Sequence, residues 1–261
     1  MNLTFIKTIS LSIFLLLTVA TSSSYAQVDT TLTQAEADGK SMAKLNLLGL
    51  PLNNFSFQYE RAIGGKKALG LGFRFMPESG IPLASVVESL IDNPQTWNEI
   101  RDFRTSNIAF TPEIRFYLGK DVFRGFYVAP FARFARYTAD LPFNFDVPDQ
   151  NGNVTTEEIP LSGDLNTLTG GILIGAQWKL SKLIYLDWSI LGPQYGVANG
   201  AVSGNRSLSA EEQDALRQEL ETLNDLPMVK TAYVVNNSGA TVNFNGPWAG
   251  IRSSFSIGFR F

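Results

Sequence analysis

The chain carries the stretch Ser254-Phe255-Ser256-Ile257-Gly258-Phe259-Arg260-Phe261 (SFSIGFRF), in which large apolar residues alternate with small or polar ones. Alternation with a period of two is typical of a β-strand with two different faces. Chain ends are usually frayed and polar, so an amphipathic strand in this place needs a pairing partner. The stretch therefore predicts a paired strand with one face toward an apolar environment.

Seven earlier segments alternate in the same way, which gives eight predicted strands: about 41–50, 54–62, 67–76, 106–118, 124–137, 168–180, 183–192 and 250–261. The connections differ in length by side. On one side they are short, at 63–66, 119–124 and 181–182. On the other side lie a tight turn at 51–53 and three long loops, at 77–105, 138–167 and 193–249. Short turns on one rim and long loops on the other are typical of outer-membrane barrels.

The residues on the two predicted faces also favour a membrane barrel. A soluble sandwich or a lipocalin-like barrel would alternate as well. Here one face is rich in Phe, Trp, Leu and Ile, while the other carries Gly, Ser and isolated charges. Small residues suit the narrow interior of an eight-stranded barrel, and large apolar residues suit lipid. We therefore predict an all-β fold, an eight-stranded antiparallel transmembrane β-barrel with short periplasmic turns and long extracellular loops bearing short helices.

The N-terminal region predicts export. Lys7, the apolar run 9–20 and Ser24-Tyr25-Ala26 form the three parts of a signal peptide. The apolar run is shorter than the ~20 residues that a spanning helix needs. We predict a cleaved signal peptide at 1–26, a short periplasmic tail at 27–40 and a barrel at 41–261. The expected location is the bacterial outer membrane.

Composition excludes several kinds of chemistry. The sequence has no histidine and no cysteine, so Ser-His-Asp catalysis, thiolate catalysis and disulfides are ruled out. The net charge of −3 without a basic run argues against a nucleic-acid partner. A hydrolase based on Glu113 and Asp187 would need one carboxyl kept protonated, and neighbouring arginines favour the ionised form of both. We predict no catalytic, cofactor-binding or metal-ligating residue, and no cofactor.

The polar face supplies a set of charged side chains for the lumen: Lys44, Glu60, Arg74, Glu113, Arg115, Arg133, Lys179, Asp187, Arg252 and Arg260. Cations outnumber carboxylates, which suits either an anion-lined channel or pocket, or a plugged lumen whose charges pair across it. Lys44, Lys179 and Arg260 are expected near the inner mouth, in contact with water. The remaining residues form the predicted lumen network: Glu60, Arg74, Glu113, Arg115, Arg133, Asp187 and Arg252.

Two of the long loops contain helix signals. In the loop 193–249, Ser209 and Glu212 have capping-box spacing ahead of an apolar stripe formed by Leu216, Leu220 and Leu223. The loop 77–105 repeats the spacing with Ser85 and Glu88, followed by Trp97, Ile100 and Phe103. These helices are expected either to cap the barrel mouth or to present a platform for a partner.

The predicted signal peptide, the segments 44–48 (KLNLL) and 57–61 (FQYER) and the aromatic final strand together resemble known proteins. They resemble the small outer-membrane barrels of the porin-like and OmpA/OmpX-like superfamily, and within it an uncharacterised group of secreted eight-stranded barrels. The resemblance implies two partners, the outer-membrane lipid and the barrel-insertion machinery. It also implies an assembly signal formed by Phe255, Ile257, Phe259 and Phe261.

The functional prediction is a structural or interaction protein without catalysis. Its loops 77–105 and 193–249 would meet an extracellular or envelope protein partner. Two alternatives stay open: a small anion-preferring pore, and a membrane enzyme that works without histidine.

Overall fold

The computed structural model describes residues 39–91, 93, 97–98, 100–148, 154–221 and 230–261. The predicted signal peptide and almost all of the predicted tail lie outside the described residues. No helix within the described ranges is long and apolar enough to cross a bilayer.

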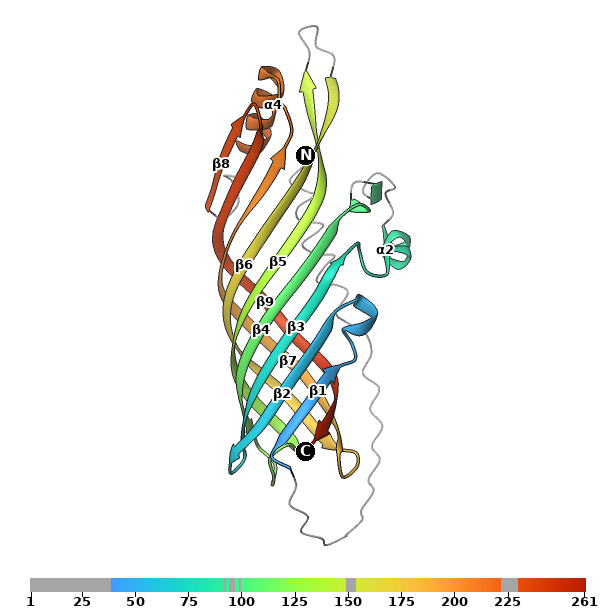
Figure 1. The fold of residues 1–261 in the computed structure, drawn as a ribbon, viewed down its shortest axis with the longest axis vertical. Coiled ribbons are helices and arrows are strands. Elements are labelled where there is room, and N and C mark those ends of the chain that lie inside the picture. The colour runs from blue at the N-terminus through green and yellow to red at the C-terminus, as the bar shows by residue number, and fades with distance from the viewer. Residues whose placement is uncertain (1–38, 92, 94–96, 99, 149–153, 222–229) are drawn as a thin grey trace. The chain divides into compact units, whose positions relative to one another are not determined.

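The described chain forms one antiparallel sheet that closes on itself (Figure 1). Its strands are β1 (Ser41–Asn46), β2 (Phe55–Gly64), β3 (Lys67–Ser79), β4 (Arg104–Tyr117), β5 (Gly125–Pro148), β6 (Val154–Lys179), β7 (Ile184–Asn205), β8 (Lys230–Asn236) and β9 (Gly239–Arg260). Each strand from β1 to β6 pairs with the next, and β9 pairs with both β7 and β1. β8 pairs only with β9, so the ring itself has the eight strands that the sequence predicts.

The two faces of the ring differ as the alternation predicts. Large apolar side chains such as Phe57, Phe73 and Ile174 are exposed on the outside, whereas Glu60 and Arg115 are fully buried inside. This distribution is the reverse of that in a soluble protein and matches a barrel whose outer surface lies in lipid. Ring closure pairs the backbone groups of neighbouring strands, which lipid requires. The fold class, a transmembrane β-barrel, is therefore confirmed.

The predicted loops 138–167 and 193–249 are largely strands, which corrects the predicted boundaries. β5 and β6 stay in register from Gly125 opposite Gln177 to Pro148 opposite Val154. β7 and β9 stay paired up to Asn205 opposite Gly239. These segments combine polar and glycine-rich stretches with an alternating apolar run at Leu141, Phe143, Phe145 and Val147, which the predicted strand end at 137 leaves out. We call the parts of β5–β9 at 138–148, 154–167, 193–205 and 230–249 the upper wall.

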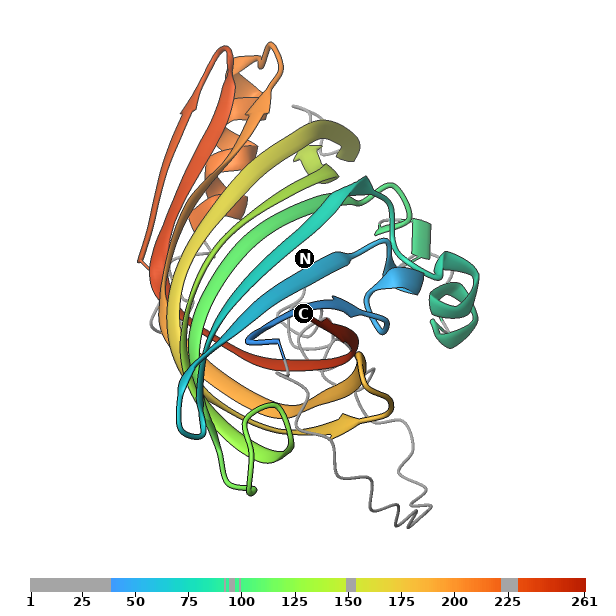
Figure 2. The same ribbon diagram turned by 60° about the horizontal axis from the view of Figure 1, so that its bottom comes forward.

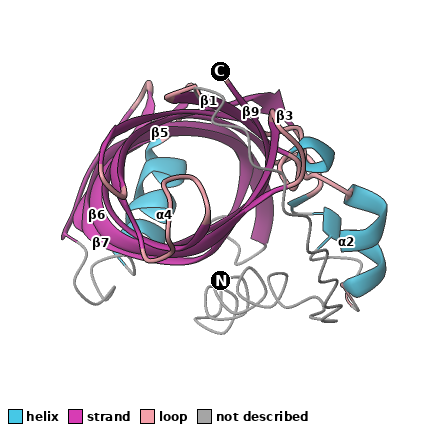
Figure 3. Cartoon of the chain, turned by 90° about the horizontal axis from the view of Figure 1, so that it is seen from below, coloured by secondary structure: helices cyan, strands magenta, loops and turns pink. Residues whose placement is uncertain are grey.

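Helix α4 (Ala210–Glu221) supports the upper wall. Leu216 and Leu220 lie in a buried apolar cluster with Phe145, Ile159, Leu208, Val235, Ala240 and Val242. Figures 2 and 3 show α4 beside the extended strands and within the outline of the ring. The predicted capping box is confirmed: Glu212 N donates to Ser209 Oγ at 3.2 Å, and Ser209 N donates to Glu212 Oε2 at 2.7 Å. Leu223 lies outside the described residues.

The predicted capping box at Ser85 and Glu88 is wrong. Helix α2 (Ala84–Leu90) begins one residue before the predicted cap, after Leu83 in a left-handed conformation (φ 54°), and no side chain caps it. Ser85 therefore lies inside the first turn, where it cannot act as the N-cap. Further along, Arg101 N donates to Trp97 O at 2.8 Å, which gives one helical turn where the sequence predicts it.

Candidate functional site

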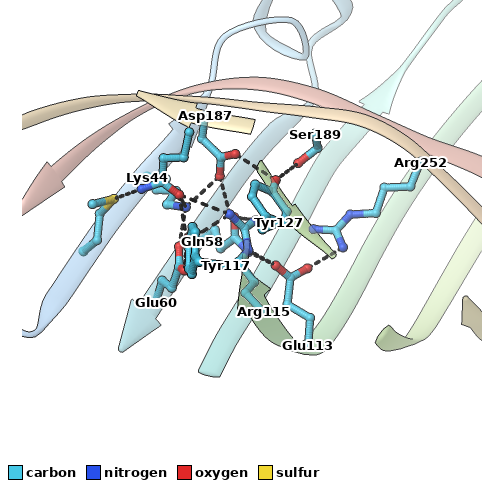
Figure 4. Close-up of polar contacts among 12 residues, drawn as sticks. Lys44, Gln58, Glu60, Glu113, Arg115, Tyr117, Tyr127, Asp187, Ser189 and Arg252 are labelled. Atoms are coloured by element: carbon cyan, nitrogen blue, oxygen red, sulfur yellow. Dashed lines mark hydrogen bonds and ion pairs between the residues drawn. The ribbon is translucent and has the colours of Figure 1, made fainter. Parts of the chain in front are cut away.

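Buried charges fill the lower part of the lumen, near the rim that holds the short turns. They come from strands far apart in sequence: Lys44 on β1, Glu60 on β2, Arg115 on β4 and Asp187 on β7 (Figure 4). Each side chain faces inward because it lies on the polar side of an alternating strand. The closed sheet brings these strands opposite one another, so side chains separated by up to 143 residues meet across the lumen.

Arg115 occupies the centre of this cluster and is completely buried. Its Nε donates to Glu113 Oε1 at 2.5 Å, and its Nη1 donates to Asp187 Oδ2 at 2.6 Å. Nη2 donates to Gln58 Oε1 at 3.0 Å, and the guanidinium lies 4.2 Å from the centre of the Tyr127 ring. A planar guanidinium suits this position because its fixed donors reach several acceptors at once.

Lys44 is part of the cluster, which corrects the prediction that it sits in water at the inner mouth. Its exposed fraction is only 4%. The ammonium donates to Asp187 Oδ2 at 2.6 Å and to Gln177 Oε1 at 3.0 Å, and it forms an ion pair with Glu60. The carboxylates of Glu60 on β2 and Asp187 on β7 both form ion pairs with Lys44. The cost of burying the lysine charge is therefore offset by two opposite charges.

The third carboxylate, Glu113, links Arg115 to Arg252. Arg252 Nη1 donates to Glu113 Oε2 at 2.5 Å, and its guanidinium lies 5.2 Å from the centre of the Phe131 ring. We call the resulting set of three cations and three carboxylates the lumen plug, formed by Lys44, Glu60, Glu113, Arg115, Asp187 and Arg252. Its formal charges balance, as buried ion pairs require.

Neutral polar groups that the sequence did not single out complete the plug. The Tyr117 hydroxyl contacts Glu60 and lies 2.8 Å from Gln177 Oε1, while the Tyr127 hydroxyl donates to Asp187 Oδ1 at 2.8 Å. Glu60 Oε2 makes ion pairs but accepts no hydrogen bond within the described chain. Near its strand end, Tyr117 resembles an interfacial aromatic residue, but it is buried. Its place on the same side of its strand as Arg115 is the signal that identifies it as a lumen residue.

An aromatic side chain lies below the plug. Phe123, in the turn between β4 and β5, has a left-handed backbone (φ 65°) and is fully buried. Its ring meets Tyr117 edge-on, with ring centres 6.1 Å apart, and the Arg260 guanidinium lies 5.1 Å from its centre. A left-handed conformation is costly for a bulky residue, so packing inside the barrel must offset it. The turn thus folds inward and closes the lumen floor.

Two arginines of the predicted lumen network lie apart from the plug. Arg74 Nε donates to Asn107 Oδ1 at 2.6 Å, and Arg133 Nη1 donates to Thr111 Oγ1 at 3.2 Å. The structure therefore brings together Glu60, Glu113, Arg115, Asp187 and Arg252, but it does not join Arg74 and Arg133 to them by an ion pair. Lys179 is exposed at the rim, and Arg260 Nη1 donates to the Tyr185 hydroxyl at 2.8 Å.

The final strand is held by its neighbours. Ser41 N donates to Phe261 O, and Phe261 N donates to Ser41 O, each at 2.9 Å. Ile257, Phe259 and Phe261 are exposed on the outside, whereas Phe255 is half-buried. The assembly role of these four residues stays a prediction.

The plug offers rigidity rather than a reactive group. Each of its carboxylates pairs with at least one cation, which leaves none free to act as a base in this arrangement. Across the described ranges, no group of three or more acidic side chains is placed to hold a metal ion. What the geometry can do is fix strands β1, β2, β4, β7 and β9 across the lumen and obstruct passage through it.

Comparisons with solved structures return membrane barrels at low similarity. Acinetobacter baumannii CarO2 is 13% identical, with 81% of this chain and 98% of that chain covered and a TM-score of 0.36. The outer membrane protease OmpT from Escherichia coli is 10% identical, with 88% and 99% covered and a TM-score of 0.31. The N-terminal β-barrel domain of Pseudomonas aeruginosa OprF is 5% identical, with 86% and 99% covered and a TM-score of 0.24.

A search of curated proteins finds no match. A family model does match, over residues 12–195, which is more than half of the chain. This agrees with the resemblance of the sequence to an uncharacterised group. The chain belongs to the family described as "Protein of unknown function (DUF3575)".

Proposed function

We propose that this protein is an outer-membrane barrel with a closed lumen and no catalytic activity, whose upper wall serves as a docking platform for a protein partner outside the cell. Its apolar outer surface supports placement in a membrane. Signal-peptide features in residues 1–26 support export to the outer membrane. The platform role rests on the upper wall.

The observation that carries the platform role is the height and support of the upper wall. On the outer face of β6 and β7, apolar Leu168 and Val197 give way to exposed Asn166 and Asn199. The strands then continue beyond this polar level to Val154 and Asn205. The α4 cluster gives this projecting sheet an apolar core of its own. A rigid surface held above the lipid is suited to recognition because little conformational entropy is lost on binding.

A pocket of about 510 Å³ lies on the upper wall. Its lining includes Asp164, Asn199, Lys230, Asn243 and Asn245. Amide and charged groups that converge on one concavity supply the donors and acceptors that fix a ligand's orientation. We place the docking contact here. The segment 77–105, with exposed Val86 and Leu90 on α2, forms a second candidate contact.

Point substitutions test the platform. The double substitution Lys230→Ala and Asn243→Ala should abolish in-cell cross-linking of the protein to its partner while the heat-modifiable gel shift of the barrel stays normal. Lys182→Ala, in the turn between β6 and β7 at the other rim, is the matched control and should leave the cross-link intact. An unchanged cross-link in the double variant would contradict docking at this pocket.

A deletion gives a second test. Because Asn205 and Gly239 are paired neighbours, residues 206–238 can be replaced by a two-residue turn. The ring does not contain this segment, so we expect the barrel to assemble and the partner to be lost. A barrel that fails to assemble after the deletion would instead assign the segment a role in the fold.

A small anion-preferring pore is the second candidate, and Arg74 and Arg133 favour it because no carboxylate pairs with them within the described residues. The plug and Phe123 argue against it, since completely buried side chains fill the lower lumen. Discrete conductance steps in a planar bilayer distinguish the two functions.

A further inference from the structure

The lumen carries more positive charge than the plug compensates. Within the plug, three cations meet three carboxylates. Arg74 on β3 and Arg133 on β5 remain, and their hydrogen-bond acceptors given above are the neutral oxygens of Asn107 and Thr111. Among the described residues, neither arginine forms an ion pair with a carboxylate.

Burial makes this excess costly. Arg133 is 7% exposed and Arg74 is half-buried. The strand register places Arg74 opposite Ala109, and Ala109 opposite Ala135, two residues along β5 from Arg133. At this spacing the two cations repel each other, and Arg252 adds to the repulsion. An arginine keeps its charge in a protein, so it cannot escape this cost by losing a proton. Buried charges are normally paired, and in the described part of the chain no carboxylate pairs with either arginine.

The neighbouring side chains suit an anion with an organic portion. Asn107 is held by a hydrogen bond from its Nδ2 to Arg136 O at 3.0 Å, which leaves its Oδ1 to position Arg74. Thr169, opposite Arg133 in the β5–β6 pair, donates to Gln194 Oε1 at 2.9 Å. Tyr137 and Trp248, whose ring centres are 5.8 Å apart, lie on the same inward face and provide apolar surface.

We propose that Arg74 and Arg133, assisted by Arg252, bind an oxyanion in the lumen above the plug. The ligand class is a carboxylate or phosphate, because the forked guanidinium matches the planar pair of oxygens in these groups. The site is independent of the docking platform, since its residues face the lumen and the platform pocket lies on the upper wall. It also differs from a pore, because the plug retains the anion above it.

Binding to the purified full-length protein in a neutral detergent tests the site. Titration calorimetry with inorganic phosphate and with benzoate, in chloride buffer, should give saturable binding for at least one of them, and benzamide should not bind. Absence of saturable binding by both anions would overturn the proposal.

Variants locate the site. Arg133→Gln and Arg74→Gln should each weaken anion binding by about tenfold or more, because each removes a charged hydrogen-bond donor. Arg136→Gln is the matched control, because Arg136 lies on the same strand as Arg133 but is exposed on the outer face. The Arg136→Gln variant should bind the anion with wild-type affinity. Wild-type affinity in a protein with both Arg74→Gln and Arg133→Gln would overturn the assignment.

Stability separates a binding role from a structural one. In buffer free of phosphate and carboxylates, Arg133→Gln should unfold at the same temperature as the wild type or higher, because an uncompensated charge has been removed. The anion that binds in calorimetry, phosphate or benzoate, should then raise the unfolding temperature of the wild type alone. A marked loss of stability without the anion would mean that Arg133 is structural. If Arg133→Gln does not fold, Arg133→Lys is the substitute variant. It keeps the positive charge but lacks the paired guanidinium donors, so it should bind the anion more weakly than the wild type.

Competition identifies the source of the oxyanion. Displacement of the bound probe by micellar phosphatidylglycerol but not by phosphatidylcholine would assign the site to an anionic lipid head group. Displacement by neither lipid would assign it to a soluble anion, and equal displacement by both would contradict a site selective for anions.

Discussion

Arg115 is the residue on which the lumen plug depends, because it contacts all three buried carboxylates. Replacing it with methionine would leave Glu60, Glu113 and Asp187 with two cations instead of three. Loss of one partner from a buried ion network typically costs ~3–5 kcal/mol. We expect Arg115→Met to lower the free energy of unfolding by that order, as measured by urea unfolding of the protein refolded in lipid.

The control for this prediction is Arg136→Met. Arg136 and Asp164 form an exposed pair 3.8 Å apart on the outer face, and such pairs contribute about 0–1 kcal/mol. If the two variants lost the same stability, the plug would have no special role in holding the barrel.

Glycines in the lumen predict a second contrast. A Cβ at Gly175 would overlap the Tyr127 phenol and lie 2.7 Å from the Trp188 carbonyl oxygen, whereas at Gly72 the nearest atoms, in Thr111, are 3.5 Å away. Tyr127 is fully buried and cannot move aside easily. Gly175→Ala should therefore cost about 1–3 kcal/mol through overpacking, and Gly72→Ala should be close to neutral. Urea unfolding of both variants checks this; equal midpoints would contradict the tight packing around Tyr127.

At this scale, alternation along each strand predicts which charged residues face the lumen, but it does not predict their partners. Lys44 illustrates the limit. Its place near a strand end suggests contact with water, yet its neighbours come from β2 and β7. Which strands meet across a barrel depends on the tilt and stagger of the whole sheet, and single-strand patterns contain no information on either.

At the scale of the element, the two predicted capping boxes have different outcomes and give a matched pair of variants. Ser209→Ala removes an observed cap of α4 and should destabilise that helix by about 1 kcal/mol. Ser85→Ala should have no such effect, because Ser85 does not cap α2. Hydrogen exchange of the helix amides measures both. Equal hydrogen-exchange protection of the α4 amides in the wild type and in Ser209→Ala would count against the cap.

The apolar support of the upper wall yields an independent prediction. Leu216 is 2% exposed in the α4 cluster, so Leu216→Ala should cost about 2–5 kcal/mol by leaving a cavity. Because α4 is not part of the ring, the loss should appear as local unfolding. Limited proteolysis should cut within 206–238 while the heat-modifiable barrel persists. Cleavage of the ring strands at the same rate would show that wall and barrel unfold together.

Strand existence is more predictable here than strand length. Segments such as 67–76 alternate aromatic and small residues and are recovered with the correct faces. The upper part of β7 is missed because most residues of the run 198–205 are polar or small. A strand above the lipid has no apolar outer face, so the periodic signal fades where the chain leaves the membrane.

In the whole molecule, the closed ring forms two regions at different heights, a part that spans the membrane and a wall above it. In the membrane, its outer surface meets lipid, while the lumen plug fixes strands across a narrow interior. Above the membrane, four ring strands and β8 continue as a wall supported by α4. Strands β1 and β2 are short and end well below the top of the upper wall. Under the proposed function, this projecting wall is the part that meets a partner.

A conductance recording tests the central claim, a barrel closed by its own charged side chains. The wild-type protein, reconstituted in a planar bilayer, should show no discrete conductance steps, because the plug and Phe123 fill the lower lumen. Steps that disappear in Arg74→Ala or Arg133→Ala would support the anion-preferring pore instead. Reproducible steps in the wild type would contradict a closed lumen.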